Sequence, residues 1–412
     1  MKNKFTYFLF ISIFILSGCT ATVRTVSPQK TKVILGGGKN IPADTVRVLL
    51  SEEISSFQYR VDIPVDLYAD GIKIAMIKKG NLIDLKRAGT ELTCRIQRKT
   101  FRANSFKVSL AGEGFLTFKK SRYRGLFEFI ASASGIMLVN HVTMNDYLRG
   151  VLPYELPTKN DKSYFQGLKA FAITARTYTV IKTDKRNQYF DLFPDTRDQV
   201  YGGADRETEM DSVAIAETEG MLIYYNNEPA QVLYHGACGG STETARHIFQ
   251  NDYPYLIPVK DGDPPNCSIS PTFGWQEVYS GEEISKFFFN TKFFMEEKAI
   301  SDIEILSRLS SGRVSKLRIS FKTGEQITLD QREIRQVFRQ KKNNGILRSL
   351  LFDIQKDFKN DVLAKLIITG KGSGHGVGLC QWGALGMSKE GADYKEIIQH
   401  YFPSTVIQIK YD

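Results

Sequence analysis

The chain has 412 residues, of which 42% are hydrophobic and 24% are charged, with 13 prolines and 33 glycines. This length favours two or three domains with a large buried core, and the composition excludes a peptide hormone, a disordered chain and a collagen-like repeat. The formal net charge is +10, and charges of both signs are interspersed. This pattern does not indicate a nucleic-acid partner, but it allows attraction to an anionic polymer.

The N-terminus has the features of an export signal. Lys2 and Lys4 precede an apolar run over 5–16, which as a helix would be about 18 Å long and too short to cross about 30 Å of hydrocarbon. A Leu-Ser-Gly-Cys sequence then ends at Cys19 and resembles the bacterial lipobox, in which the cysteine carries the lipid. We predict a lipoprotein signal peptide over 1–18 and lipidation of Cys19; a plain secretory signal with a chance cysteine is the alternative.

The rest of the chain is expected to be extracytoplasmic and anchored to the cell membrane or outer membrane by its lipid alone. No other apolar run is long enough to span a bilayer. Residues 19–40 are polar and contain three consecutive glycines, as expected of a flexible tether. Four further cysteines are too few for a disulfide scaffold: Cys94, Cys238, Cys267 and Cys380.

The remaining segments predict an α+β protein. Residues 41–120 contain short β-branched and aromatic runs separated by turn residues, which indicates a β-rich N-terminal region. After further strands up to 142, Ser163 and Gln166 have capping-box spacing at the start of a helix, and a second helix is predicted over 207–219. A β-hairpin is expected over 221–235.

The C-terminal half is predicted to contain an inserted α/β lobe over 281–360. It would divide a mixed, β-rich core with a few helices into 121–280 and 361–412. The last part includes a strand, a glycine-rich segment over 370–378 and an amphipathic helix. The glycine-rich segment lacks the order of a Walker or Rossmann phosphate loop, so its glycines are expected to let the backbone approach a ligand around His375. A structural histidine is the alternative.

Glu155 is the candidate general acid. It lies between Pro153 and Pro157, and prolines restrict the backbone, so a stiff loop is expected to present this carboxyl group among apolar neighbours. Burial there would raise the pKa of Glu155, as general-acid catalysis near neutral pH requires. Taken alone, a solvated loop glutamate is the competing interpretation.

A metal site is the second chemical possibility. Three thiolates and one imidazole suit tetrahedral Zn²⁺, and the chain offers Cys238, Cys267, Cys380 and His235. The spacing matches no established zinc-finger pattern, so a Cys238–Cys267 disulfide and free buried thiols remain alternatives.

Several sequence blocks occur in a recognisable order. They are Asp-Tyr-Leu-Arg-Gly-Val-Leu-Pro-Tyr-Glu-Leu-Pro (146–157), Leu-Lys-Ala-Phe-Ala-Ile-Thr-Ala-Arg-Thr-Tyr (168–178), Gln-Val-Tyr-Gly-Gly (199–203), Tyr-His-Gly-Ala-Cys-Gly-Gly-Ser-Thr-Glu (234–243), Pro-Tyr-Leu (254–256) and Gly-His-Gly-Val-Gly-Leu-Cys-Gln-Trp-Gly-Ala (374–384). Together they resemble the stage II sporulation protein D (SpoIID) family, which is related to the LytB amidase enhancer. The resemblance covers about residues 120–412.

The resemblance implies a peptidoglycan lytic transglycosylase that cleaves between N-acetylmuramic acid and N-acetylglucosamine, on strands whose stem peptides an amidase has removed. The acidic residue of the family corresponds to Glu155, while Tyr154 stands where the family often has serine. Some members bind a structural zinc through cysteine and histidine. Spore formation is one setting for the family among others.

A single carboxyl group is sufficient for this reaction. Ordinary glycosidases need two carboxylates, whereas Glu155 could protonate the glycosidic oxygen and then deprotonate the muramic 6-hydroxyl, which closes a 1,6-anhydro ring. No cofactor is expected for catalysis. The candidates to hold the sugar are Arg176, Gln199, Tyr201, His375 and Gln381. Helix-surface solvation of Arg176 and core packing of Tyr201 are the competing interpretations.

Two other functions remain open at this stage. One is a non-catalytic peptidoglycan-binding activator of a cell-wall amidase. The other is a muramidase that uses water, with its second carboxylate at Asp195 or Asp198.

Overall fold

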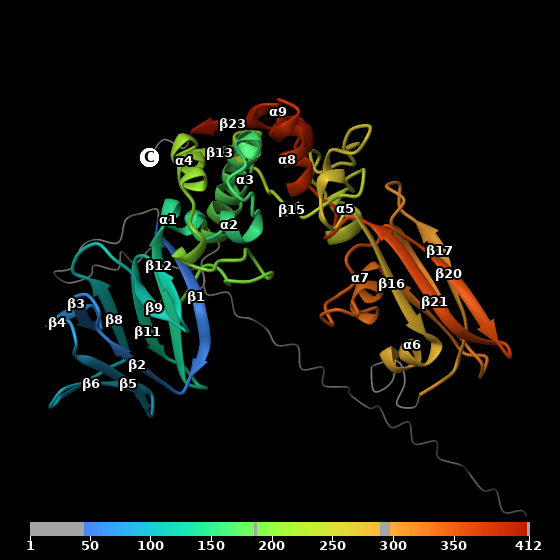
Figure 1. Ribbon diagram of the computed structural model, residues 1–412. Helices are drawn as coiled ribbons and strands as arrows, with labels where there is room; N and C mark the ends of the chain where they lie inside the picture. The colour runs from blue at the N-terminus through green and yellow to red at the C-terminus, as the bar shows by residue number, and fades with distance from the viewer. Residues whose placement is uncertain (1–44, 185–187, 289–296, 410–412) are drawn as a thin grey trace, which may run out of the picture.

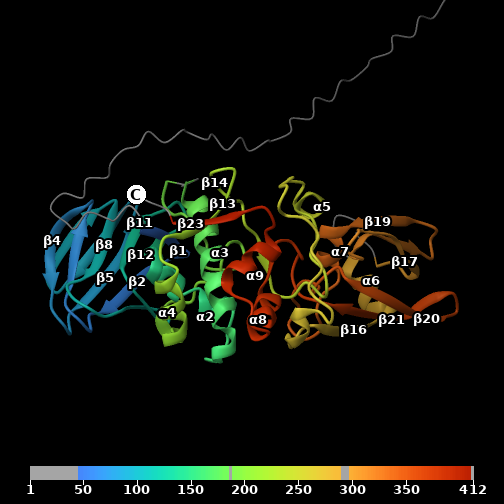
Figure 2. The ribbon, with the colours of Figure 1, turned by 90° about the horizontal axis from the view of Figure 1, so that it is seen from above.

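The computed structural model describes residues 45–184, 188–288 and 297–409. The predicted signal peptide, Cys19 and the tether lie outside the described residues. No helix in the described ranges has both the length and the apolar character needed to cross a membrane. Three parts follow one another in a row: a β-rich region, a helical centre and a second lobe (Figures 1 and 2). The α+β class is as predicted.

The β-rich region contains two larger antiparallel sheets and one two-stranded sheet. The six-stranded sheet has the order β1 (Thr45–Ile54), β12 (Ile136–Thr143), β11 (Leu126–Ala131), β8 (Ser105–Leu110), β3 (Val65–Ala69) and β4 (Ile72–Ile77). The four-stranded sheet has the order β2 (Ser56–Arg60), β5 (Leu82–Ala88), β6 (Glu91–Ile96) and β7 (Lys99–Ala103), and β9 (Leu116–Phe118) pairs with β10 (Ser121–Tyr123). Because β12 pairs with β1 from Thr45 to Ile54, this region continues to Thr143 and not only to residue 120.

The helical centre surrounds the long helix α3 (Phe165–Asp184). Its other helices are α1 (Met144–Arg149), α2 (Leu152–Glu155), α4 (Glu209–Glu217), α5 (Ala245–Phe249), α8 (Gln381–Lys389) and α9 (Tyr394–Tyr401), with 3-10 turns η1 (Lys162–Tyr164), η2 (Ala204–Arg206) and η3 (Asn266–Ile269). A short antiparallel sheet joins β14 (Glu228–Pro229), β13 (Met221–Tyr225) and β23 (Val406–Ile409), and β15 (Tyr234–His235) runs parallel to β22 (Leu379–Cys380).

Two local expectations in this part were wrong. The capping box of Ser163 and Gln166 does not form, because η1 precedes α3 and Asp161 accepts a hydrogen bond from the Ser163 backbone N–H at 3.0 Å. Gln166 instead accepts one from the backbone N–H of Tyr394 at 3.3 Å. The hairpin ends at β14, and the chain continues to β15. This strand pairs with β22, in which Leu379 lies 145 residues after its partner Tyr234.

The second lobe has its own hydrophobic core. It contains β16 (Gly274–Ser280), α6 (Gly281–Phe288), β17 (Ile300–Arg308), β18 (Val314–Phe321), β19 (Gln326–Asp330), α7 (Gln331–Val337), β20 (Phe352–Lys359) and β21 (Val362–Lys371). The lobe is wider than 281–360 at both ends, because β16 and β21 pair from Gly274–Lys371 to Ser280–Lys365 and both contribute to its core.

Candidate active site

Glu155 is the last residue of the one-turn helix α2, and not part of an irregular loop. Proline is tolerated in the first turn of a helix because the N–H that it lacks has no intrahelical partner there. Pro153 occupies this position, and Leu152 and Leu156 are both buried on either side of the helix. The apolar anchors therefore fix the helix, and the carboxyl group of Glu155 is only partly exposed.

Three segments distant in sequence donate hydrogen bonds to the Glu155 carboxyl group. The backbone N–H of Val200 donates to Oε1 at 2.7 Å. The Tyr234 hydroxyl donates to the same oxygen at 3.4 Å, and Gln381 Nε2 donates to Oε2 at 3.4 Å. The short bond from Val200 fixes one oxygen, while Oε2 has only the longer contact with a side-chain amide.

Burial raises the pKa of Glu155 above its usual value. The hydrogen bonds from Val200, Gln381 and Tyr234 favour the charged form and oppose this shift in part. No carboxylate among the described residues contributes to the shift. Glu155 therefore keeps its proton to a higher pH than a solvated glutamate, which is the property required of a general acid.

Gln199 lies behind this site and not in it. Its side chain is fully buried, and Oε1 accepts hydrogen bonds from the Tyr147 hydroxyl at 3.1 Å and from Thr179 Oγ1 at 2.9 Å. These bonds hold the segment whose next residue, Val200, contacts Glu155. Gln199 thus positions the site through the backbone.

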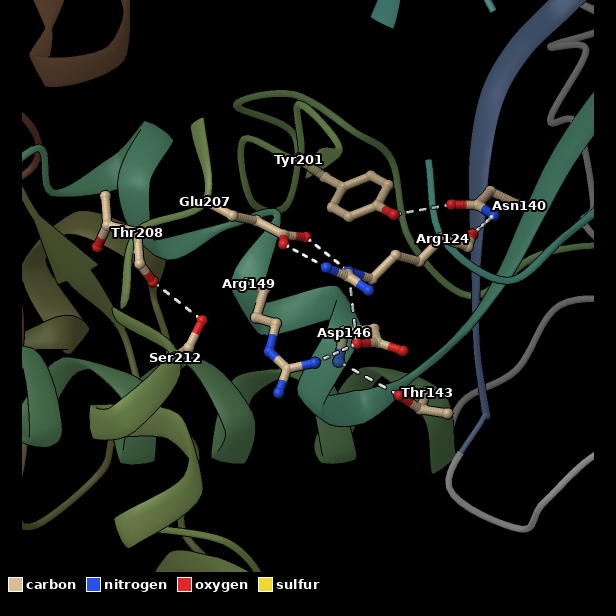
Figure 3. Close-up of polar contacts among 9 residues, drawn as sticks. All are labelled: Arg124, Asn140, Thr143, Asp146, Arg149, Tyr201, Glu207, Thr208 and Ser212. Atoms are coloured by element: carbon tan, nitrogen blue, oxygen red, sulfur yellow. Dashed lines mark hydrogen bonds and ion pairs between the residues drawn. The ribbon is translucent and has the colours of Figure 1, made fainter. Parts of the chain in front are cut away.

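Arg176 and Tyr201 are packed elsewhere. The guanidinium of Arg176 is buried and donates to the carbonyls of Ile215 at 3.2 Å and Met221 at 3.4 Å. Tyr201 is also buried, and its hydroxyl donates to Asn140 Oδ1 at 2.8 Å (Figure 3). The structure brings neither of them to the Glu155 carboxyl group.

The ion pairs beside Tyr201 join the β-rich region to the helical centre. Arg124 donates to both carboxylate oxygens of Glu207, at 2.8 and 2.6 Å, and pairs with Asp146 of α1 at 3.7 Å. Within α1, Arg149 donates to Asp146 at 2.6 Å (Figure 3). An open groove of about 800 Å³ lies beside Arg124 and Asp146. Glu155 is not among the residues that line this groove.

His375 is held as a neutral ring. Its Nδ1 accepts a hydrogen bond from the Val377 backbone N–H at 3.0 Å, and its ring contacts Phe249 edge-on at 5.0 Å between centroids. Burial lowers the pKa of His375 to about 3. A histidine in this state carries no charge near neutral pH.

The acidic candidates for a second carboxylate are committed to other partners. Asp198 accepts hydrogen bonds from the Tyr178 hydroxyl and the Phe193 N–H, both at 2.9 Å, and pairs with Lys182 at 2.8 Å. Asp195 pairs with Arg197 at 2.8 Å.

Two contacts of Glu155 were not singled out from the sequence. Val200 acts through its backbone N–H, for which its side chain gives no signal. Tyr234 precedes His235 in one of the sequence blocks, and its phenol is brought to Glu155 by the parallel pairing of β15 with β22.

Three of the predicted metal ligands do come together. Cys238, Cys267 and Cys380 are fully buried, and their sulfurs and a carboxylate oxygen of Asp261 all lie within 4.8 Å of one another. His235 is not in this group; its Nδ1 donates to the Val377 carbonyl at 3.1 Å. The four-donor set is therefore three cysteines and an aspartate, where the sequence suggested three cysteines and a histidine.

Two family models match the chain. The model described as "Stage II sporulation protein" (SpoIID) matches residues 132–225, and a domain of unknown function (DUF8618) matches residues 250–378. The first match contains Glu155. The second contains the whole lobe from β16 to β21, together with Asp261 and Cys267.

Comparison with curated proteins finds relatives over most of the chain. An uncharacterized protein of Brachyspira hyodysenteriae is 32% identical over 292 residues, which cover 70% of this chain and 73% of the relative. The stage II sporulation protein D of Bacillus subtilis is 26% identical, over 65% of this chain and 75% of the relative. The amidase enhancer of Bacillus subtilis is also 26% identical, over 63% of this chain but only 40% of the relative. The chain belongs to the family of stage II sporulation protein D and the amidase enhancer.

Proposed function

We propose that this protein is a peptidoglycan lytic transglycosylase that cleaves glycan strands between N-acetylmuramic acid and N-acetylglucosamine. The observation that carries the proposal is the state of Glu155, a partly buried carboxyl group with a raised pKa, fixed on one oxygen by Val200. Family membership supports a role at the cell wall.

Glu155 acts first as an acid. Because Oε1 already accepts a 2.7 Å bond from Val200, the proton is placed on Oε2. Oε2 donates this proton to the glycosidic oxygen, the bond from that oxygen to the muramic C1 breaks, and the N-acetylglucosamine leaves with a new hydroxyl group. Glu155 is now a carboxylate, stabilised by its hydrogen-bond donors.

Glu155 then acts as a base. It takes the proton from the 6-hydroxyl of the same muramic residue, whose oxygen attacks C1 and closes the 1,6-anhydro ring. The proton lost in the first step is regained, and no water is consumed. Since the nucleophile belongs to the substrate, ring closure needs no second carboxylate to activate water. Asp195 and Asp198 are held by hydrogen bonds and ion pairs with other side chains, which favours this route over a water-using muramidase.

The remaining features of the proposal concern substrate and location. We expect the substrate to be glycan strands without stem peptides, and the site to be extracytoplasmic, with the lipid on Cys19 as the only membrane anchor. Gln381 is the predicted sugar-binding candidate whose side chain contacts the Glu155 carboxyl group. Acid–base chemistry of this kind requires no cofactor.

A second candidate function is activation of a cell-wall amidase without cleavage. The similarity to an amidase enhancer favours it. Under this function, purified protein would leave glycan strands intact and would increase the rate of an added amidase.

Product analysis separates these functions and tests Glu155. We expect purified glycan strands to yield fragments with 1,6-anhydro ends, one water lighter than hydrolysis products in mass spectrometry. Glu155→Gln is expected to lower the rate about 10²–10⁴-fold, because removal of a general acid–base group has this effect. The matched control is Glu228→Gln at the exposed first residue of β14, which should cleave at the wild-type rate. Hydrated ends, or full activity of Glu155→Gln, would contradict the mechanism.

A further inference from the structure

Four buried donor groups converge where three segments meet. Cys238 follows β15, Asp261 and Cys267 lie in the segment that leads to the lobe, and Cys380 ends β22. All four side chains are fully buried, and their donor atoms lie within 4.8 Å of one another. We infer that Cys238, Asp261, Cys267 and Cys380 form a structural zinc site with one carboxylate ligand.

The spacing of the sulfurs suits ligands around a cation. In tetrahedral coordination a Zn–S distance of about 2.3 Å places two ligand sulfurs about 3.8 Å apart. The sulfurs of Cys238 and Cys267 are 3.5 Å apart. A disulfide requires about 2.05 Å, and these cysteines are not bonded to each other.

Backbone amides point at the sulfurs. Cys380 Sγ accepts from the N–H groups of Cys238 at 3.1 Å and Gly383 at 3.3 Å. Cys238 Sγ accepts from the Gly240 N–H at 3.4 Å. Such N–H···S bonds stabilise thiolates and orient them, as outer partners of metal ligands do.

Asp261 is oriented in the same way. The Tyr401 hydroxyl donates to its Oδ1, and the Cys267 N–H donates to its Oδ2 at 2.9 Å. Each carboxylate oxygen has two lone pairs, so one remains free on each for a metal ion. A carboxylate of this kind is an ordinary oxygen ligand of zinc.

The surroundings offset part of the negative charge and close the site. Three thiolates and a carboxylate exceed the charge of one Zn²⁺, and the buried guanidinium of Arg313 donates to the Cys238 carbonyl at 2.7 Å. Helix α8 passes directly over the cluster, since a Cβ at Gly383 would lie 2.4 Å from Asp261 Oδ1. Four protein ligands and no free position are the features of a structural zinc site.

The proposed ion would tie together the segment after β15, the segment entering the lobe and the start of α8. Gln381, the first residue of α8, follows Cys380 directly and contacts Glu155. The site would therefore position Gln381. The role of Gln381 beside Glu155 rests on the proposed function, whereas the zinc site itself does not.

The test is the metal content of the full chain, purified in detergent under reducing conditions without chelator. We expect one zinc per chain by elemental mass spectrometry. Replacement of the zinc by Co²⁺ should give the near-ultraviolet thiolate-to-cobalt absorption of tetrahedral sites. Binding should release the three thiol protons as the Zn–S bonds form.

Matched variants test the ligand set. Cys267→Ser and Asp261→Asn are expected to lose zinc on dialysis, while Cys94→Ser, an equally buried thiol on β6, and His235→Gln should keep it. Retention of zinc by Asp261→Asn and its loss from His235→Gln would overturn the aspartate ligand.

Two results would overturn the site itself. The first is wild-type protein without zinc that gives no cobalt absorption on addition of Co²⁺. The second is a Cys238–Cys267 disulfide found by peptide mapping of protein purified without reductant. Cobalt titration of wild-type protein still decides the question if a cysteine variant fails to fold. None of these readouts depends on strand cleavage, so they stay valid if the protein does not cut glycan.

Discussion

At the scale of single residues, the behaviour of Glu155 depends on opposing effects on its pKa. Burial raises the pKa, and three donors lower it. Val200 makes the short bond through its backbone N–H, so a change of its side chain to that of any residue other than proline leaves the donor in place. Gln381 can be removed, since only its side-chain amide reaches Oε2.

Gln381→Ala should raise the pKa of Glu155 further, because it removes a donor that favours the carboxylate. In the pH profile of kcat/KM, activity falls at high pH as Glu155 loses its proton. In the variant this fall should therefore occur at a higher pH. The maximal rate should fall about 3–10-fold, the effect of one lost neutral hydrogen bond of about 1 kcal/mol. Strand cleavage measured across pH checks both expectations.

The control for this variant is Gln355→Ala, an exposed glutamine on β20 of the lobe. Its profile should match that of the wild type. A fall that moves to lower pH in Gln381→Ala would mean that Gln381 does not stabilise the carboxylate.

At the scale of elements, α8 connects the two chemical sites. Its N-cap residue is Cys380, its first residue contacts Glu155, and its glycines allow close packing. A Cβ at Gly386 would lie 2.2 Å from the Asn266 carbonyl oxygen, so the helix lies directly on the segment that carries Asp261 and Cys267.

Gly383→Ala should destabilise the protein, although alanine is favoured over glycine by about 1 kcal/mol in an exposed helix. The new methyl group would lie 2.0 Å from the Tyr401 hydroxyl, and overpacking costs about 1–3 kcal/mol in net stability. Denaturant unfolding should give this loss. Lys389→Ala, at the exposed end of the same helix, should stay within about 0.5 kcal/mol of the wild type. A Gly383→Ala protein more stable than the wild type would refute the close packing.

At the scale of the whole molecule, Arg313 attaches the lobe to the helical centre. It is 1% exposed and donates to the carbonyls of Cys238 at 2.7 Å and Ser241 at 2.9 Å. Gly376 provides the space, because a Cβ there would lie 2.4 Å from the guanidinium. Ser311 adds a bond from its hydroxyl to Glu243 at 2.6 Å.

Arg313→Met should loosen this attachment. The variant keeps the apolar stem but leaves two buried carbonyls without donors, at a cost of roughly 1–3 kcal/mol each. Hydrogen exchange should become faster in β16 and β21, which connect the lobe to the rest of the chain. Arg318→Met on the neighbouring strand β18 is the control, since Arg318 makes only a partly exposed pair with Glu304. Unchanged exchange in Arg313→Met would show that the lobe is held by other contacts.

The sequence by itself determined the features that depend on neighbouring residues. The α+β class, the helix at Glu209–Glu217 and the strand Val314–Phe321 follow from local periodicity. The prolines around Glu155 indicated a restrained carboxylate, because their effect on the backbone needs no tertiary partner.

Only the tertiary structure decided which distant residues meet. The pairing of β16 with β21 set the limits of the lobe, and the pairing of β15 with β22 brought Tyr234 to Glu155. The same folding placed Asp261 with the thiols and buried Arg176 among backbone carbonyls. Such contacts join segments far apart in sequence; Gln381 and Glu155 are separated by 226 residues. No local pattern encodes which polar group will satisfy another across that separation.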